Sequence, residues 1–150
     1  MPRFTYLGNQ NFIIAKQSVR KTKLGLLAAG SGLTPIYQIV NAMHLAKDKT
    51  VEVKMIYSNK SEEDILMKQQ LDTINGECEN IEIKHCLSRQ VDVPTWARKG
   101  RITWEMIQEM GFAEPSAETL ICYCGPSGFN QLVKALFKEH GYDESMMFIF

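Results

Sequence analysis

The amino-acid sequence predicts an α/β fold, a doubly wound sheet of five parallel strands preceded by a short N-terminal hairpin. Strand-like and helix-like patterns alternate from residue 23 to the C-terminus, which is typical of a parallel sheet with helices on both faces. Two turns, Gly30–Gly32 and Cys124–Pro126, each follow an apolar run and open an amphipathic one. Open α/β sheets bind ligands at such strand-to-helix turns. The length of 150 residues and the apolar content of 45% suit one domain with a sizeable core.

The expected elements follow one another in a regular order. The segment 3–15 alternates around Gly8 and predicts a hairpin. Ser61 and Asp64 form a capping-box pattern that should cap the second helix, and Gly141 is placed to end the last helix as a C′ glycine. After the hairpin we expect strands at 24–28, 51–57, 81–87, 120–124 and 146–150, and helices at 33–46, 62–74, 103–110 and 127–140.

Charge and composition exclude several classes of function. Seventeen basic residues balance 17 acidic ones, so no net field attracts nucleic acid or an anionic membrane, and we expect no nucleic-acid partner. The longest weakly polar stretch, 24–40, is interrupted by glycines and Pro35, so it predicts no membrane span. The N-terminus lacks the features of a secretory signal, and the 4 cysteines are too few for a disulfide framework. We therefore expect a cytoplasmic protein.

The cysteines give no pattern of metal ligands. Cys122 and Cys124 flank one residue on an expected strand, and we expect their side chains to point to opposite faces, which disfavours joint ligation. Cys78 and Cys86 are not at zinc-finger spacing. We therefore expect no metal site.

The first glycine turn predicts an anion site. Gly30-Ser31-Gly32 follows a strand of buried type and precedes a helix whose first turn contains Thr34 and Pro35. Glycines allow a sharp turn and the close approach of a phosphate, Pro35 preorganises the helix start, and the free amides favour an anion such as a pyrophosphate. The alternative is a glycine turn required only for packing. The spacing matches neither the usual dinucleotide fingerprint nor a Walker loop.

The second turn places the thiol of Cys124 at the end of the expected strand 120–124. A cysteine there could be the nucleophile of a hydrolase, but neither His85 nor His140 is placed by a recognised nucleophile-and-base pattern. The alternative is that Cys124 serves as a small buried hydrophobic residue.

Five sequence motifs carry a resemblance to a known family. In chain order they are Ala28–Pro35, Asn59–Leu66, Gly100–Ile102, Cys124–Pro126 and Phe148–Phe150. Their order and spacing resemble the pyridine-nucleotide-binding half of NADH-cytochrome b5 reductases, within the ferredoxin-NADP reductase superfamily. Soluble flavohaemoproteins that fuse a cytochrome b5 domain to such a reductase look most similar, and nitrate reductases are similar as well.

The resemblance implies roles for residues of both turns. The residues that would hold the diphosphate of NADH or NADPH are Gly30, Ser31, Gly32 and Thr34, with Pro35 at the helix start. Cys124 would be the catalytic residue beside C4 of the nicotinamide. Gly125 and Pro126 would shape the pocket of the ring so that it stacks on a flavin. Phe150 would lie near that flavin.

One position departs from the NADH-dependent members of the family. These have an Asp after the third strand that holds the adenosine ribose, whereas this sequence has Ser88-Arg89. A hydroxyl and a guanidinium at this place resemble the NADPH-using branches, in which they bind the 2′-phosphate. Lys99 and Arg101 could add positive charge nearby, and we expect Arg101 to bind the cofactor. The sequence predicts that NADPH is accepted, or even preferred to NADH; the alternative is that Arg89 is a solvated loop charge.

The resemblance also implies a function for the whole chain. Residues 21–150 would form the pyridine-nucleotide-binding domain of a cytochrome b5 reductase-type oxidoreductase, and residues 1–20 the end of a linker from an FAD domain on the N-terminal side that this chain lacks. The domain would present nicotinamide C4 to FAD, from which electrons pass to cytochrome b5 or another haem protein, and it would be inactive alone. Missing regions could place it at the cytosolic face of the endoplasmic reticulum. The alternative is a non-catalytic sensor of the nicotinamide pool that docks through Phe150.

Overall fold

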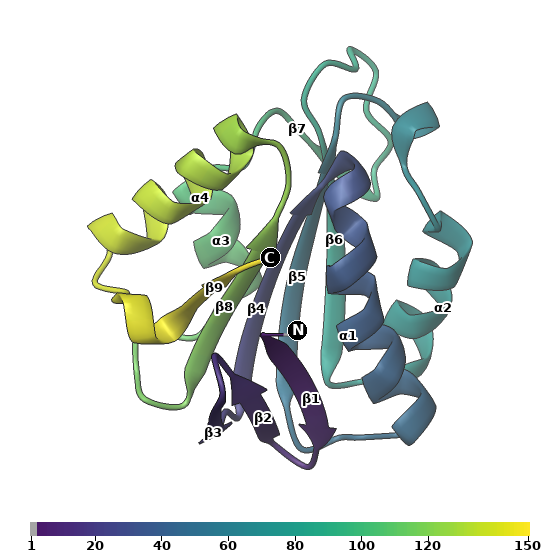
Figure 1. The fold of residues 1–150 in the computed structure, drawn as a ribbon. Helices are drawn as coiled ribbons and strands as arrows, with labels where there is room; N and C mark the ends of the chain where they lie inside the picture. The colour runs from purple at the N-terminus through teal and green to yellow at the C-terminus, as the bar shows by residue number, and fades with distance from the viewer. Residues whose placement is uncertain (1–2) are drawn as a thin grey trace.

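The computed structural model describes residues 3–150 and arranges them in two sheets (Figure 1). The main sheet is parallel, with the strand order β7-β6-β5-β4-β8-β9, and a small antiparallel sheet has the order β1-β2-β3. The strands are β1 (Phe4–Gly8), β2 (Asn11–Ile14), β3 (Gln17–Arg20), β4 (Lys23–Ala29), β5 (Glu52–Asn59), β6 (Ile81–Leu87), β7 (Ala97–Lys99), β8 (Thr119–Cys124) and β9 (Met147–Ile149). The helices are α1 (Leu33–Ala46), α2 (Lys68–Glu77), α3 (Trp104–Met110) and α4 (Ser127–Glu139), with the 3-10 turns η1 (Gly30–Gly32), η2 (Glu62–Asp64) and η3 (Glu144–Met146).

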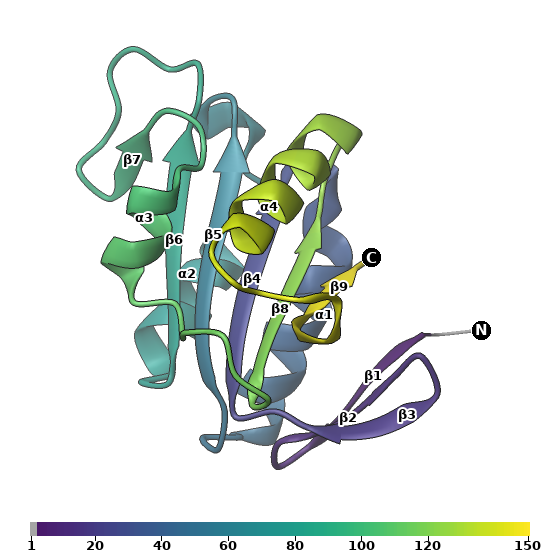
Figure 2. The ribbon, with the colours of Figure 1, turned by 90° about the vertical axis from the view of Figure 1, so that its left-hand side faces the viewer.

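The helices cover the two faces of the main sheet in pairs. Helices α1 and α2 pack on one face, and α3 and α4 pack on the other, which faces the viewer in Figure 2. The chain starts at the central strand β4, adds β5, β6 and β7 on one side, and then adds β8 and β9 on the other. This arrangement confirms the predicted doubly wound class. The direction of winding changes between β4 and β8, and α/β sheets bind ligands at such a switch point.

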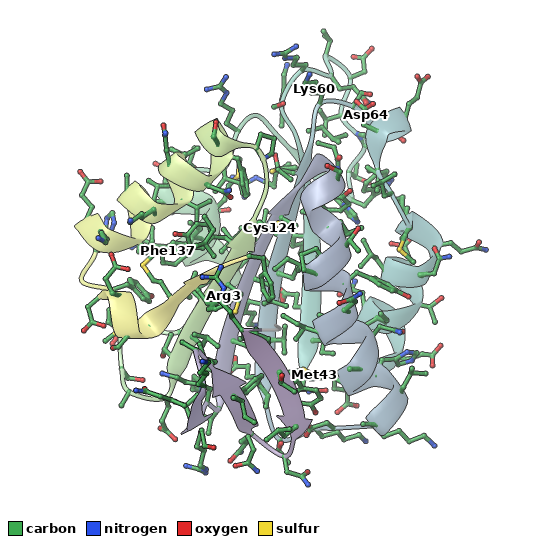
Figure 3. The ribbon with its side chains drawn as sticks, viewed as in Figure 1. Arg3, Met43, Lys60, Asp64, Cys124 and Phe137 are labelled. Carbon is green, nitrogen blue, oxygen red and sulfur yellow. The ribbon has the colours of Figure 1, made fainter. Side chains whose placement is uncertain are left out.

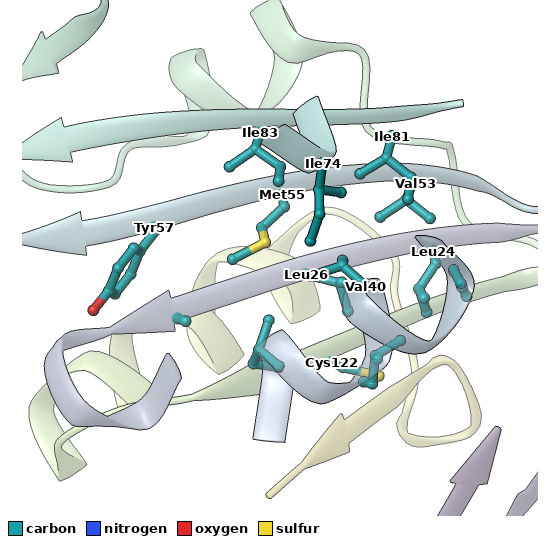
Figure 4. Packing of buried hydrophobic residues seen from close by; sticks show 14 of the residues in the cluster. Leu24, Leu26, Val40, Val53, Met55, Tyr57, Ile74, Ile81, Ile83 and Cys122 are labelled. Atoms are coloured by element: carbon teal, nitrogen blue, oxygen red, sulfur yellow. The ribbon is translucent and has the colours of Figure 1, made fainter. Parts of the chain in front are cut away.

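Each face of the sheet has its own apolar core. Because successive side chains of a strand point to opposite faces, β4 contributes to both cores. On one face Leu26 and Met55 pack with Val40 of α1 and Ile74 of α2, as Figure 4 shows. On the other face Phe137 of α4 is fully buried. The cores fix the strands in register and hold their carboxyl ends at one edge of the sheet.

The N-terminal sheet contains two tight hairpins where the sequence predicted one. The first turn has positive φ at Asn9 (50°) and Gln10 (74°), and the second at Ala15 (49°) and Lys16 (68°). Two consecutive residues with positive φ are characteristic of a type I′ turn, which suits the twist of a hairpin. The strand β3 is therefore an addition to the predicted hairpin.

The hairpins are attached to the amino-terminal edge of the main sheet. Phe12 is fully buried in the core beneath α1. The Tyr6 hydroxyl donates a hydrogen bond to the carboxylate of Asp48, in the loop between α1 and β5. The same carboxylate accepts from the amide of Asn9 at 3.1 Å and from the amide of Thr50 at 2.9 Å. These bonds join the small sheet to the end of the molecule away from the carboxyl ends of the strands.

Two regions of the main domain differ from the sequence-based prediction. The short strand β7 extends the sheet to 6 strands, because 97–99 pairs with the end of β6. The helix expected over 62–74 is divided into η2 and α2. Met67, between them, has a left-handed φ of 54°, which no α-helix accommodates. Ser61 and Asp64 do form a capping box, but it caps η2 and not the long helix.

The prediction for Cys122 and Cys124 was wrong. Residues two apart on a strand point to the same face, and both side chains pack on the α1 face.

Within residues 3–150 no group of three or more potential metal ligands is assembled. Over the same described residues, no helix is long and apolar enough to cross a membrane.

Candidate nucleotide-binding cleft

A cleft of about 750 Å³ opens at the carboxyl ends of the central strands. It is lined by segments that follow β4, β5, β6, β7 and β8. The predicted cofactor-binding residues in its lining are Gly30, Ser31, Ser88, Arg89, Arg101 and Pro126. Other lining residues include Asn59, Lys60, Asp64, Leu66, Ile102 and Phe129. Figure 3 shows Lys60 and Asp64 at this upper end of the molecule. The fold thus gathers residues from five segments around one hollow.

The two glycine-containing turns pack directly against each other. A Cβ atom on Gly32 would lie 2.3 Å from the carbonyl oxygen of Cys124 and 2.8 Å from Cα of Gly125. A Cβ on Gly125 would in turn lie 2.6 Å from the ring of Phe129. Real Cβ atoms do not approach other atoms so closely, so these two positions require glycine for packing. Gly32 and Gly125 lie behind the lining of the cleft and fix the relation between its two walls.

The turn η1 leads into the start of α1 at the edge of the cleft. Gly30 has a left-handed φ of 56°, and its carbonyl accepts the amide of Leu33, closing the turn η1. The N-cap of α1 is Gly32, and no side chain caps it. The first amides of a helix have no partner within the helix, and with the helix dipole they favour an anion. Thr34 and Pro35 are in the first turn of α1, but neither lines the cleft.

Cys124 ends β8 and lies next to the cleft without lining it. Its side chain is half-buried, and burial raises the pKa of the thiol. The thiol is therefore neutral at physiological pH, which does not suit a cysteine nucleophile. The turn that follows is held by the side-chain amide of Asn130, which donates to the Gly125 carbonyl at 2.8 Å.

Three cations line the other end of the cleft. The loops after β5 and β6 are joined there, because the amide of Arg89 donates to the Lys60 carbonyl at 2.9 Å and the amide of Ser88 donates to the Asn59 carbonyl at 2.9 Å. The ion pairs within residues 3–150 do not include Lys60, Arg89 or Arg101. Uncompensated cations that converge on a hollow favour an anionic ligand. Lys99, by contrast, does not line the cleft.

Asn59 places a buried amide in the same region. The residue is 6% exposed, and neither the nitrogen nor the oxygen of its side chain has a hydrogen-bond partner among the described residues. Buried polar groups normally have hydrogen-bond partners. The Asn59 side chain is therefore available to hydrogen-bond a ligand in this part of the cleft.

Phe150 lies outside the cleft lining. Its amide donates to the carbonyl of Tyr123 at 3.1 Å, next to the end of β8. Its ring packs against Phe148, at a centroid distance of 4.9 Å, and against Phe4 of the hairpin, at 5.1 Å. The structure therefore places Phe150 between the second turn and the N-terminal sheet.

The sequence-based site omitted the basic side chain of Lys60 and the apolar side chains of Leu66 and Phe129. Lys60 and Leu66 belong to the motif Asn59–Leu66, so the motif itself was the available signal. Phe129 becomes part of the lining because it lies in the first turn of α4, directly after the second turn.

These features define an α/β domain with a polar cleft at the switch point of its sheet. The sequence model of the oxidoreductase NAD-binding domain family matches residues 26–135. The chain belongs to this family, which confirms the predicted resemblance and the nicotinamide nucleotide as its cofactor.

Individual relatives agree with this assignment. The chain is 33% identical over 146 residues to an NADH-cytochrome b5 reductase-like protein of Arabidopsis thaliana, covering 87% of this chain and 43% of the relative. It is 27% identical to the nitrate reductase [NADPH] of Aspergillus niger over 150 residues, which is 99% of this chain and 17% of that enzyme. The chain thus spans less than half the length of these curated relatives.

Solved structures show the same fold. The cytochrome b5 reductase domain of Ulva prolifera nitrate reductase superposes with a TM-score of 0.89 at 21% identity, covering 100% of this chain and 56% of that one. The CS-b5R domains of human Ncb5or, in an NAD+ form, superpose with a TM-score of 0.75 at 26% identity, covering 87% of this chain and 37% of that one.

Proposed function

We propose that this chain is the domain that binds NADPH, and also NADH, in a flavin-dependent reductase of the cytochrome b5 reductase type. The observation that carries this proposal is the cleft itself. It joins a helix start without a side-chain cap to three cations that form no ion pair within residues 3–150, across the switch point of the sheet. A dinucleotide has a diphosphate in its centre and, in NADPH, a further phosphate at its adenosine end, so both features have a partner in one ligand.

The order of the lining residues matches the order of groups in an extended dinucleotide. Ser88 follows β6, Asn59 ends β5, Gly30 follows β4 and Pro126 follows β8. These four strands are consecutive in the sheet, so the cleft spans three strand spacings, or about 14 Å. We place the adenosine at the β6 end, the diphosphate over η1, and the nicotinamide at the β8 end.

The residues of the central part would bind the diphosphate. The amides of Ser31 and Gly32 and the hydroxyl of Ser31 lie at the start of α1 and can donate to phosphate oxygens. Thr34 and Pro35 support this interaction from the first helical turn. Because Gly32 packs on the peptide of Cys124, the diphosphate site and the second turn hold a fixed spacing.

The residues of the β8 end would orient the ring that reacts. The bound nucleotide supplies a hydride from C4 of its nicotinamide, and FAD from an adjacent domain would accept it. The neutral thiol of Cys124, with Gly125 and Pro126, would form a wall that positions the ring and excludes water. The raised pKa of Cys124 argues against the alternative of a cysteine hydrolase.

The N-terminal sheet would join this domain to its FAD domain. In this proposal residues 1–20 belong to the connecting segment and 21–150 to the nucleotide-binding domain. Phe150 and Phe4 pack together near the end of β8, which supports a contact of this face with the flavin domain. Cytochrome b5 or another haem protein would be the final acceptor. Assayed alone, the 150 residues should show no diaphorase activity.

Calorimetric titration of the 150-residue chain tests the proposed ligand. We expect binding of both nucleotides, with NADPH bound more tightly, because Arg89, Lys60 and Arg101 line the cleft and form no ion pair among the described residues. No binding of either nucleotide would refute the function, and much tighter binding of NADH would refute the selectivity.

A further inference from the structure

Tyr57 is a fully buried tyrosine whose hydroxyl reaches the glycine turn from below. It lies on β5, and its exposed fraction is 0%. Figure 4 shows its side chain extending from β5 toward the turn that follows β4. The hydroxyl donates to the carbonyl of Gly30 at 2.8 Å. The amide of Leu66, in the segment between η2 and α2, donates to the same hydroxyl at 3.4 Å. Tyr57 thus connects two segments that both line the cleft.

The conformation of Gly30 depends on this support. Its φ of 56° is one that glycine adopts freely, and no atom lies within 4 Å of the place a Cβ would occupy. Apart from its chain neighbours, nothing packs against this side of the residue. Its carbonyl is instead held by two donors, the Tyr57 hydroxyl and the Leu33 amide. Burial raises the pKa of Tyr57, which keeps its hydroxyl protonated and able to donate.

We propose that Tyr57 is a positioning residue for the diphosphate of the nucleotide. It holds the Gly30 carbonyl on the protein side of the turn, so that the amides of Ser31 and Gly32 stay directed toward the ligand. Through Leu66 it also ties the turn to the far wall of the cleft. This inference rests on the proposed function, since it assigns a role within the same binding site.

Tyr142 provides a matched control for substitution of Tyr57. It is also buried, at 4% exposed, and its hydroxyl also donates to a backbone carbonyl, that of Ala113. It packs in the core of the α3 and α4 face and does not line the cleft. Tyr57→Phe and Tyr142→Phe each remove one buried hydroxyl donor, so both should lower Tm by a similar few degrees.

The test titrates the wild-type chain and both variants with NADPH and with adenosine 2′-monophosphate, a probe that lacks the diphosphate. We expect Tyr57→Phe to weaken NADPH binding about 3- to 10-fold, the equivalent of one lost net hydrogen bond. We expect its affinity for adenosine 2′-monophosphate to match that of the wild type, and Tyr142→Phe to bind both ligands as the wild type does. Amide NMR shifts of 30–33 should change in Tyr57→Phe and not in Tyr142→Phe.

Three other results would each contradict the positioning role of Tyr57, for different reasons. Unchanged NADPH affinity in Tyr57→Phe, or an equal loss for both ligands, would overturn the positioning role while leaving nucleotide binding intact. An equal loss of NADPH affinity in Tyr142→Phe would show that the effect is one of general stability, and would also overturn it. Absence of NADPH binding in the wild type would overturn the proposed function itself, and with it this inference.

Discussion

The two ends of the cleft are built on different physical principles. At the β8 end, Gly32 and Gly125 are in backbone contact, and even one added methyl group has no room. At the β6 end, the side chains of Arg89 and Lys60 are exposed, line the cleft and form no ion pair within residues 3–150. Under the proposed function, the packed end would determine whether the site forms, and the cationic end would determine which nucleotide it prefers. Substitutions at the two ends should therefore fail in different ways.

The largest effect is expected for Gly32→Ala at the packed end. The added Cβ would lie 2.3 Å from the Cys124 carbonyl, so one turn must move. We expect a loss of about 1–3 kcal/mol in the free energy of unfolding, as for an overpacked core. Displacement of the turn should weaken nucleotide binding about 100-fold. Urea unfolding and calorimetry measure the two effects.

Gly76→Ala is the control for this substitution. Gly76 is in α2, and no atom lies within 4 Å of a Cβ at that position. The substitution should stabilise the chain by about 0.5–1 kcal/mol and leave binding unchanged. Wild-type affinity in Gly32→Ala would show that the contact between the two turns is not required.

A smaller and selective effect is expected for Arg89→Ala at the cationic end. Loss of a charge-assisted contact with the 2′-phosphate should weaken NADPH binding about 10- to 100-fold and leave NADH binding within about 2-fold. Arg98→Ala is the control, because Arg98 pairs with Glu109 and does not line this cleft. Equal losses for NADPH and NADH in calorimetric titrations would assign Arg89 a general role and remove the basis for selectivity.

Replacement of Cys124 should separate orientation from affinity. In the complete reductase, Cys124→Ala should lower the rate of hydride transfer in single-turnover experiments by about 10-fold, because the ring loses a wall of its pocket. The dissociation constant should change by less than about 3-fold, since the diphosphate and adenosine contacts remain. If rate and affinity fall equally, Cys124 contributes to general binding and not to ring orientation.

The smallest effect on binding is expected at the opposite edge of the sheet. Burial alone would raise the pKa of Asp48, but hydrogen bonds from Thr50, Tyr6 and Asn9 outweigh it and lower the pKa below its usual 3.8. A carboxyl whose pKa is lower in the folded chain stabilises the fold above its unfolded pKa, and this stabilisation is lost as the pH falls through the folded value. Asp48→Asn should therefore reduce stability at pH 7 by about 1–3 kcal/mol, and by less at pH 3, where the unfolded carboxyl is mostly protonated.

Urea unfolding at the two pH values, with Asp72→Asn as control, measures this prediction. Asp72 forms an exposed pair with Lys68 and should contribute less than about 0.5 kcal/mol. Nucleotide affinity at pH 7 should be unchanged in both variants, because neither carboxylate lines the cleft. A stability loss in Asp48→Asn that is as large at pH 3 as at pH 7 would contradict the assignment.

Elements with continuous patterns could be predicted from the sequence, and those that depend on distant contacts could not. The helix at 33–46 and the strand at 81–87 were predicted with their observed bounds, because apolar spacing and flanking turns agree there. The strand β7 depends on pairing with β6, and its three residues are too few to show a strand pattern in the sequence. The helix break at Met67 depends on a left-handed backbone conformation. The sequence gives no indication of it, because residue 67 is neither glycine nor asparagine.

Only part of the site could be predicted from the sequence. Gly30, Ser31 and Pro126 line the cleft as the turn motifs indicated. The packing of Gly32 on Cys124 could not be predicted, because it joins two loops through the reversal of winding in the sheet. The support that Tyr57 gives to Gly30 has the same origin, a contact between neighbouring strands.

A crystal structure of the chain with NADP+ tests the central claim most directly. We expect the diphosphate over η1, with its oxygens about 2.9 Å from the amides of Ser31 and Gly32, and the 2′-phosphate beside Ser88 and Arg89. The nicotinamide should lie against Pro126 and Cys124. A nucleotide bound elsewhere, or a cleft that stays closed by side chains at saturating NADP+, would contradict the account.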